Sequence, residues 1–224
     1  MAAVSTIKRV RVWSGPLRLA HWLMAFAVLV LLGTGWLLDA VPSAYQALLD
    51  YHYLAGYALI AGVLIRLYLL FFGHATETVG ALVPRRQQAG AVLDMLRFYV
   101  SLGRWRLPAW YAHNPLWQPL YLILLVLLVL QILTGVFADA PYLVAGRSLP
   151  GWHALGSVVI ATFCGLHIAA AFVHDLKGTG SDVSAIINGH RIFIINPLQA
   201  PARPGVQSVS VDSIRKSPPR SGDA

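Results

Sequence analysis

Four stretches of the chain are long and apolar enough to cross a lipid bilayer as single helices. They cover residues 19–38, 52–73, 116–137 and 152–174. An α-helix rises about 1.5 Å per residue, so roughly twenty residues match the hydrocarbon thickness of a membrane. The pattern predicts an all-α integral membrane protein in which four spanning helices form a bundle.

The polar gaps between the apolar stretches are not uniform. In one of them, residues 91–102 (AVLDMLRFYVSL) form an amphipathic pattern, which predicts a helix lying in the membrane interface between the second and third spans. From about residue 197 the chain is rich in Pro and Ser, which predicts a disordered cytoplasmic tail. The expected organisation is a membrane domain over residues 1–196 and a tail over residues 197–224.

Composition and charge agree with a membrane protein and add its orientation. Charged residues make up 12% of the chain, about half the share of a soluble domain. Fifteen Lys and Arg fall on the side of the two termini, only Arg147 falls on the other side, and Arg66 lies within the second span. The positive-inside rule therefore predicts that both termini are cytoplasmic. The net charge of +8 is not gathered on a nucleic-acid-binding motif, so we expect no nucleic-acid partner.

Histidines are the chemically informative residues of the spans. His153 and His167 lie fourteen residues apart, which is nearly four helical turns, so both leave the same face about 21 Å apart. The predicted topology sets His21 at the depth of His167, and His52 at the depth of His153. We call His21 and His167 the inner pair, and His52 and His153 the outer pair.

Each pair offers two neutral imidazoles from two different helices, as a bis-histidine haem in a helical bundle requires. No Asp, Glu or Cys lies beside either pair to complete a zinc or copper site. The single cysteine, Cys164, excludes a C-x-x-C-H attachment, so the prediction is two non-covalently bound b haems. His174 is a less favoured alternative to the inner ligand.

Two further positions share this lattice of fourteen residues. Gly35 follows His21 by fourteen residues, and its missing side chain would leave room for the macrocycle. Arg66 follows His52 by fourteen residues, and its guanidinium is expected either to pair with a haem propionate or to reach the lipid headgroups. His113, before the third span, is expected to order that turn or to line a quinone pocket.

Several segments of the chain resemble one known family. They are PLRLAHWL, YHYLAGY, IRLYLLFFG, AHNPL, LQILTGVF, WHALGSVVIATFCGLHIAAAFVHDL and SAIINGHR. On these motifs the chain is similar to the b-type cytochrome subunits of membrane-bound Ni/Fe-hydrogenases. This is a bacterial di-haem cytochrome b family, related to the cytochrome subunits of formate dehydrogenase and thiosulfate reductase.

The resemblance implies a subunit of an oxidoreductase complex, with no catalytic side chains of its own, in the bacterial cytoplasmic (inner) membrane. Its two b haems would be held by His21, His52, His153 and His167. Electrons would pass from a periplasmic redox enzyme, through the outer and then the inner haem, to quinone. The quinone pocket is expected near the inner haem, with His113 and Asn114 as candidate residues.

Two alternatives stay open on the sequence. One is a quinol-oxidising cytochrome that passes electrons outward to a c-type cytochrome or a reductase. The other is a small transporter or assembly protein without a cofactor. The first two spans lack the paired Gly and Pro breaks of discontinuous transporter helices, which speaks against a transporter.

Overall fold

A computed structural model of the protein describes residues 6–178 and 181–195. The chain divides into two compact units, and the larger one, residues 9–193, contains every helix of the described chain. Of the smaller unit, the described part is residues 6–8 and 194–195, which extend the strands β1 and β4. The disordered tail predicted for residues 197–224 lies outside the described residues.

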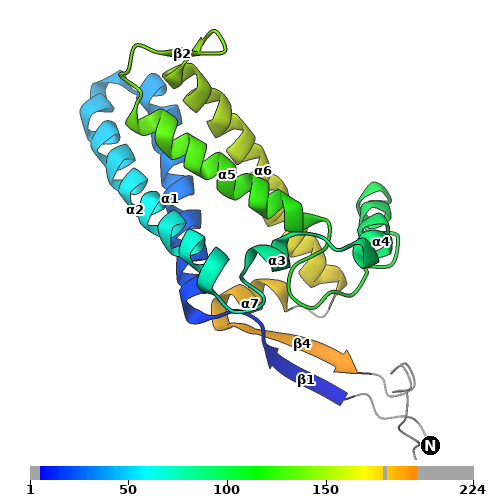
Figure 1. Ribbon diagram of the computed structural model, residues 1–224. Coiled ribbons are helices and arrows are strands. Elements are labelled where there is room, and N and C mark those ends of the chain that lie inside the picture. Colours follow the sequence, from blue (N-terminus) through cyan, green and yellow to red (C-terminus); the bar gives the residue numbers. More distant parts are fainter. Residues whose placement is uncertain (1–5, 179–180, 196–224) are drawn as a thin grey trace, which may run out of the picture. The chain divides into compact units, whose positions relative to one another are not determined.

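Four long helices dominate the larger unit (Figure 1). They are α1 (Gly15–Ala40), α2 (Tyr45–Phe72), α5 (Trp117–Val136) and α6 (Leu149–Lys177). Helix α1 packs along α2, α5 packs along α6, and α2 also contacts α5. All four helices are long and apolar enough to span a membrane, so the predicted all-α membrane bundle is confirmed.

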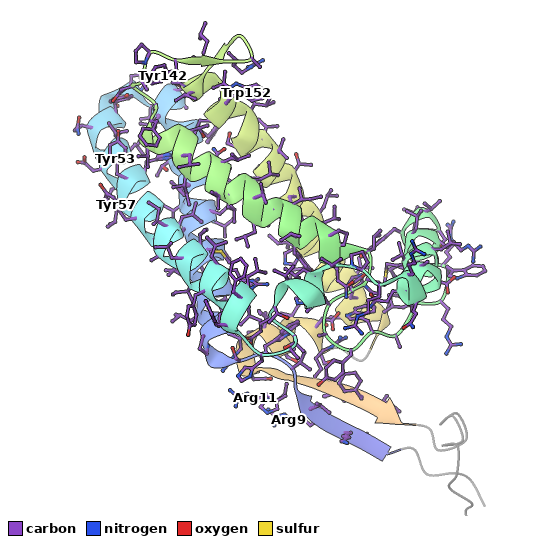
Figure 2. All side chains as sticks on the ribbon, in the orientation of Figure 1. Arg9, Arg11, Tyr53, Tyr57, Tyr142 and Trp152 are labelled. Carbon is purple, nitrogen blue, oxygen red and sulfur yellow. The ribbon has the colours of Figure 1, made fainter. Side chains whose placement is uncertain are left out.

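The bundle keeps only a thin core and turns most of its apolar surface outward. Leu59, Val63 and Leu128 are buried between the helices. In contrast, Tyr53 and Tyr57 lie exposed along the outer side of α2 (Figure 2). A water-soluble bundle buries such side chains, so this distribution is that of a bundle whose solvent is lipid.

Helices α1, α2 and α6 begin before the apolar stretches that predict them, and a serine caps two of these three starts. Ser14 caps α1 by accepting a hydrogen bond from the backbone N–H of Leu17, and Ser148 caps α6 by accepting one from Gly151. Each cap is followed by a proline within the first two helical positions, where its fixed φ suits a helix and its missing N–H costs nothing. Hydropathy marks the part of a helix that faces lipid, whereas the caps mark where the helix starts.

Shorter elements occupy the ends of the bundle. Helix α4 (Ala89–Val100) covers most of the predicted amphipathic segment and buries Met95 and Phe98. A small antiparallel hairpin, which the sequence did not predict, turns through Ala145 and Gly146, both with positive φ, before α6. The remaining elements are β1 (Thr6–Arg11) paired with β4 (His190–Ile195), β2 (Leu143–Val144) paired with β3 (Arg147–Ser148), η1 (Pro42–Ala44), α3 (Val79–Leu82), η2 (Arg86–Gln88) and α7 (Asp182–Asn188).

Candidate haem-binding site

The inner pair is formed by α1 and α6. The rings of His21 and His167 face each other with their centroids 6.4 Å apart and their planes 57° apart. Aromatic side chains surround His167: Phe163 stacks on it, while Trp117 and Tyr121 present their edges. The Nδ1 atom of His21 is buried and has no hydrogen-bond partner among the described residues.

The outer pair is formed by α2 and α6. The ring centroids of His52 and His153 lie 6.2 Å apart, with the planes 64° apart. Helix α6 therefore contributes one histidine to each pair, as the spacing of fourteen residues predicts. The inner pair thus joins α6 to α1, and the outer pair joins α6 to α2.

Threonines hold both rings of the outer pair. Thr34 Oγ1 lies 2.9 Å from His52 Nδ1, and Thr134 Oγ1 lies 3.2 Å from His153 Nδ1. Each hydroxyl proton is used in a bond to a carbonyl one turn earlier in the same helix. The hydroxyl oxygens therefore accept from Nδ1–H of the imidazoles, which leaves Nε2 unprotonated and able to bind a metal.

The separation of the rings fits a metal ion clamped between them. Two metal–imidazole bonds of about 2.0 Å, each extended by about 1.1 Å to the ring centre, give roughly 6.2 Å between centroids. The inner and outer pairs measure 6.4 Å and 6.2 Å. Among the described residues, no group of three or more His, Cys, Asp and Glu is arranged to hold a metal ion. A pair of imidazoles suits a cofactor that supplies the other four ligands itself, which is what a porphyrin does.

Glycines give the outer pair its space. A Cβ built on Gly35 would lie 3.6 Å from His52 Cε1, in ordinary contact. A Cβ built on Gly135 would lie only 2.9 Å from His153 Cε1, closer than side chains pack. That Gly35 leaves room for a macrocycle stays a prediction from its spacing, whereas the spacing does not point to Gly135. The sequence does contain an indication of Gly135: Gly35 and Gly135 each directly follow a threonine, and these two threonines bind His52 and His153.

Arg66 is buried in α2, and its environment differs from a simple headgroup contact. Its Nη1 donates a 2.9 Å hydrogen bond to the backbone carbonyl of Glu77. The Glu77 side chain is itself fully buried and accepts hydrogen bonds from the N–H groups of Ser14 and His74. The predicted pairing of Arg66 with a propionate stays a prediction, and its guanidinium is held inside the protein rather than at the headgroups.

A cavity of about 470 Å³ lies beside the predicted quinone residues. It is lined in part by Thr76, Trp110, Tyr111, His113 and Gln118. Its volume is within the range of small-molecule sites. Burial lowers the pKa of His113 to about 4, so this imidazole stays neutral at physiological pH.

A series of ring contacts links the cavity to the inner pair. The ring of His113 contacts that of Tyr121 at 5.7 Å, and Tyr121 contacts His167 at 5.8 Å. Next to His113, the Asn114 side chain is buried, and its Nδ2 has no hydrogen-bond partner in the described part of the chain. Gln118 Oε1, in the cavity lining, is also buried and unpaired among the described residues, so an acceptor is left for a ligand, whereas Asn114 lies close enough to act on the Tyr99 hydroxyl.

The alternative inner ligand, His174, is engaged elsewhere. Its Nε2 lies 2.7 Å from the Tyr99 hydroxyl, and its Nδ1 faces Asp182 at 3.7 Å. Both ring nitrogens therefore have protein partners, which favours His167 over His174 as the residue facing His21.

Comparison with known proteins agrees with this geometry. Residues 12–189 match the family described as prokaryotic cytochrome b561. A probable Ni/Fe-hydrogenase B-type cytochrome subunit of Cupriavidus necator is 30% identical over 223 residues, which cover 86% of this chain and 91% of that protein.

Proteins with related names in other bacteria are similar to the same extent. The one from Bradyrhizobium diazoefficiens is 30% identical, with 82% of this chain and 86% of that protein covered. The probable Ni/Fe-hydrogenase 1 B-type cytochrome subunit of Escherichia coli K12 is 28% identical, with 80% and 89% covered. No solved structure matches the chain significantly.

Proposed function

The chain belongs to the prokaryotic cytochrome b561 family, and from this premise we propose that it carries electrons across the membrane between a periplasmic redox enzyme and quinone. Membership makes the protein a multi-pass membrane cytochrome that binds haem b and serves electron transport. The proposal adds how many haems it binds, which residues hold them and where the electrons go. Its main support is the two pairs of facing imidazoles at separations that suit iron.

Two haems are proposed, one held by the inner pair and one by the outer pair. When bound, haem iron takes up and releases one electron at a time without needing an open coordination position. His52 and His153 present Nε2 because Thr34 and Thr134 accept from Nδ1, which orients both rings across the gap between α2 and α6. The pairs are about 21 Å apart along α6, so electrons would cross the bilayer in steps.

Quinone is proposed to bind in the cavity beside the inner pair. His113, which lines the cavity, and Asn114, which follows it in the chain, are the residues proposed to contact the quinone. His113 and Trp110 provide ring surfaces in the cavity wall, and only Tyr121 separates His113 from His167. An electron leaving the inner haem would thus have a short path to a quinone in this cavity.

The partner and the orientation are proposed from the relatives and from charge. The similar proteins are named as cytochrome subunits of Ni/Fe-hydrogenases, so a hydrogenase of this type is the proposed electron donor. The distribution of fifteen Lys and Arg against one supports a bacterial inner-membrane protein with both termini in the cytoplasm. The outer pair would then face the periplasmic enzyme.

The experiment that tests this function is haem counting joined to electron transfer in the purified full-length protein. Wild type should contain two b haems per chain, and a quinone analogue such as decylubiquinone should oxidise them after reduction. His167→Ala should lose the inner haem together with quinone reactivity, whereas His52→Ala should lose only the outer haem. A His167→Ala protein that keeps two haems would contradict the ligand assignment, and reduced wild type that no quinone oxidises would contradict the function.

A further inference from the structure

A network of polar side chains lies next to the proposed quinone cavity and has no part in holding the haems. Tyr99 on α4 lies 2.7 Å from His174 on α6, and His174 lies 3.7 Å from Asp182 on α7. Arg191 on β4 pairs with Asp182 at 2.5 Å. We call Tyr99, His174 and Asp182 the relay. His174 and Asp182 are eight residues apart on successive helices, and the fold brings Tyr99 to them from a distant part of the chain.

The protons of the relay have one consistent direction, with a hydrogen bond between Tyr99 and His174 and a longer contact of 3.7 Å between His174 and Asp182. The indole N–H of Trp117 is a donor only, and it donates to the Tyr99 oxygen at 2.7 Å. The Tyr99 hydroxyl proton is then free to point at His174 Nε2, and neutral His174 carries its own proton on Nδ1, toward the Asp182 carboxylate. Every proton in the relay thus points from the interior toward Asp182.

The two ends of the relay reach different surroundings. The Asp182 side chain is 21% exposed, whereas the His174 side chain is 7% exposed. Burial raises the pKa of Asp182, while Arg191 opposes that shift, so the carboxyl accepts a proton more readily than a free one. At the other end, burial raises the pKa of Tyr99, and Asn114 lies close enough to act on the same hydroxyl.

The relay also shares a wall with the cavity. Trp110 lines the cavity and sets its ring against the edge of His174, with centroids 5.0 Å apart. Arg191 donates to the backbone carbonyls of Trp110 and Tyr111, so the same guanidinium holds the cavity wall and Asp182. The other charged or titratable groups that act on His174 are Asp175 and His167 of its own helix.

We propose that the relay conducts the protons that quinone reduction consumes, from the surface at Asp182 toward a quinone in the cavity that Trp110 lines. This rests on the proposed quinone function. Reduction of a quinone to a quinol takes two electrons, delivered singly, and two protons. In each transfer the Asp182 O–H bond breaks as an N–H bond forms at His174 Nδ1. The His174 Nε2–H bond breaks as a new Tyr99 O–H forms, and the earlier Tyr99 proton forms an O–H on the quinone.

The observed arrangement is the one that such a transfer leaves behind. After a proton has passed inward, Asp182 is a carboxylate, His174 holds its proton on Nδ1 and Tyr99 donates to Nε2. Arg191 stabilises the carboxylate in this state. Uptake of the next proton at Asp182, with return of the His174 proton to Nε2, resets the chain.

The test compares an acceptor that needs protons with one that does not. Full-length protein reduced with dithionite is mixed either with decylubiquinone or with ferricyanide, and haem oxidation is followed by absorbance. Asp182→Asn and Tyr99→Phe should slow oxidation by decylubiquinone about tenfold or more, while oxidation by ferricyanide, the haem content and the haem potentials stay unchanged. Asp94→Asn, an exposed acid on α4, and Tyr68→Phe, an exposed tyrosine on α2, are matched controls that should keep both rates.

The rate with decylubiquinone is divided by the rate with ferricyanide for the same protein preparation, so the ratio does not depend on the yield of the variant. In Asp182→Asn and Tyr99→Phe, the slowing of oxidation by decylubiquinone should increase as pH rises, because solvent is then the remaining proton donor. Equal rate ratios in wild type, Asp182→Asn and Tyr99→Phe would overturn the relay while leaving the quinone function intact. Failure of wild type itself to reduce decylubiquinone would instead overturn the function on which the relay rests.

Discussion

A methyl group added at Gly135 should weaken the binding of the haem proposed at the outer pair, by displacing His153. The Cβ of alanine at this position would lie 2.9 Å from His153 Cε1 and 3.3 Å from His153 Nδ1. Ordinary contacts begin at 3.4 Å, so the imidazole must move by at least 0.5 Å. That movement disturbs the bonds from Nδ1 to Thr134 Oγ1 and to the Gln131 carbonyl, which are 3.2 Å and 3.1 Å long.

The cost of such overpacking sets the size of the effect. Inserting a methyl group into a filled site costs about 1–3 kcal/mol. At roughly 1.4 kcal/mol per factor of ten, the affinity for the outer haem should fall about 5- to 150-fold. The inner pair lies about 21 Å away along α6, so its haem should be retained.

Haem content per chain, measured by the pyridine haemochrome method during stepwise dilution in detergent, checks this expectation. Gly135→Ala should fall toward one haem per chain, while Gly33→Ala should keep two because its Cβ would meet nothing within 4 Å. A redox titration should show that the component lost is the same one that His52→Ala removes. Full retention of both haems in Gly135→Ala, with unchanged potentials, would refute the assigned role of this contact.

Three other changes test neighbouring parts of the structure. Thr134→Val removes the oxygen that accepts from His153 Nδ1–H, so the midpoint potential of the outer haem should rise and its affinity should drop about 10- to 100-fold in a redox and haem titration. The His113 pKa of about 4 in the folded protein lies below its ordinary 6.5, so the unfolded chain binds the extra proton first and stability is lost as pH falls from 6.5 to 4. Between pH 6.5 and 4 the unfolding free energy of His113→Gln should therefore fall by up to about 3 kcal/mol less than that of wild type, as followed by thermal unfolding. Identical pH dependence of the two proteins would argue against a buried neutral imidazole. Glu77→Gln should lower the unfolding free energy by about 1–3 kcal/mol, since the charged acceptor of the Ser14 and His74 N–H groups is lost, and an unchanged melting temperature would contradict this.

The fold and the pairing of the histidines could be predicted from the long-range periodicity of the sequence. Hydropathy marks helices that face lipid, and a spacing of fourteen residues brings His153 and His167 onto one face of α6 whatever the tertiary structure. Depth in the bilayer then restricts which histidine on another helix can meet each of them. These arguments need only helix geometry and the order in which the spans cross the bilayer, both of which can be taken from the sequence.

Other parts depended on contacts between segments that no local pattern connects. The pairing of β1 with β4, and the contact of Tyr99 with His174, join residues that are 75 or more positions apart. Asp182 lies only eight positions from His174, but no local pattern indicates that the two side chains meet. The role of Gly135 was hidden for another reason. A Thr-Gly pair is common, and only its recurrence opposite a histidine, as Thr34 with Gly35 and Thr134 with Gly135, makes it informative.

Helix α6 differs from α1 and α2 in carrying two of the proposed haem ligands rather than one, and this restricts how its sequence can change. Each residue turns an α-helix by about 100°, so inserting or deleting one residue between His153 and His167 would swing one imidazole away from its partner. The same change in α1 after His21, or in α2 after His52, leaves the single ligand of that helix where it was. The thirteen residues between His153 and His167 should therefore keep their number in related chains, even where the side chains of the interval differ.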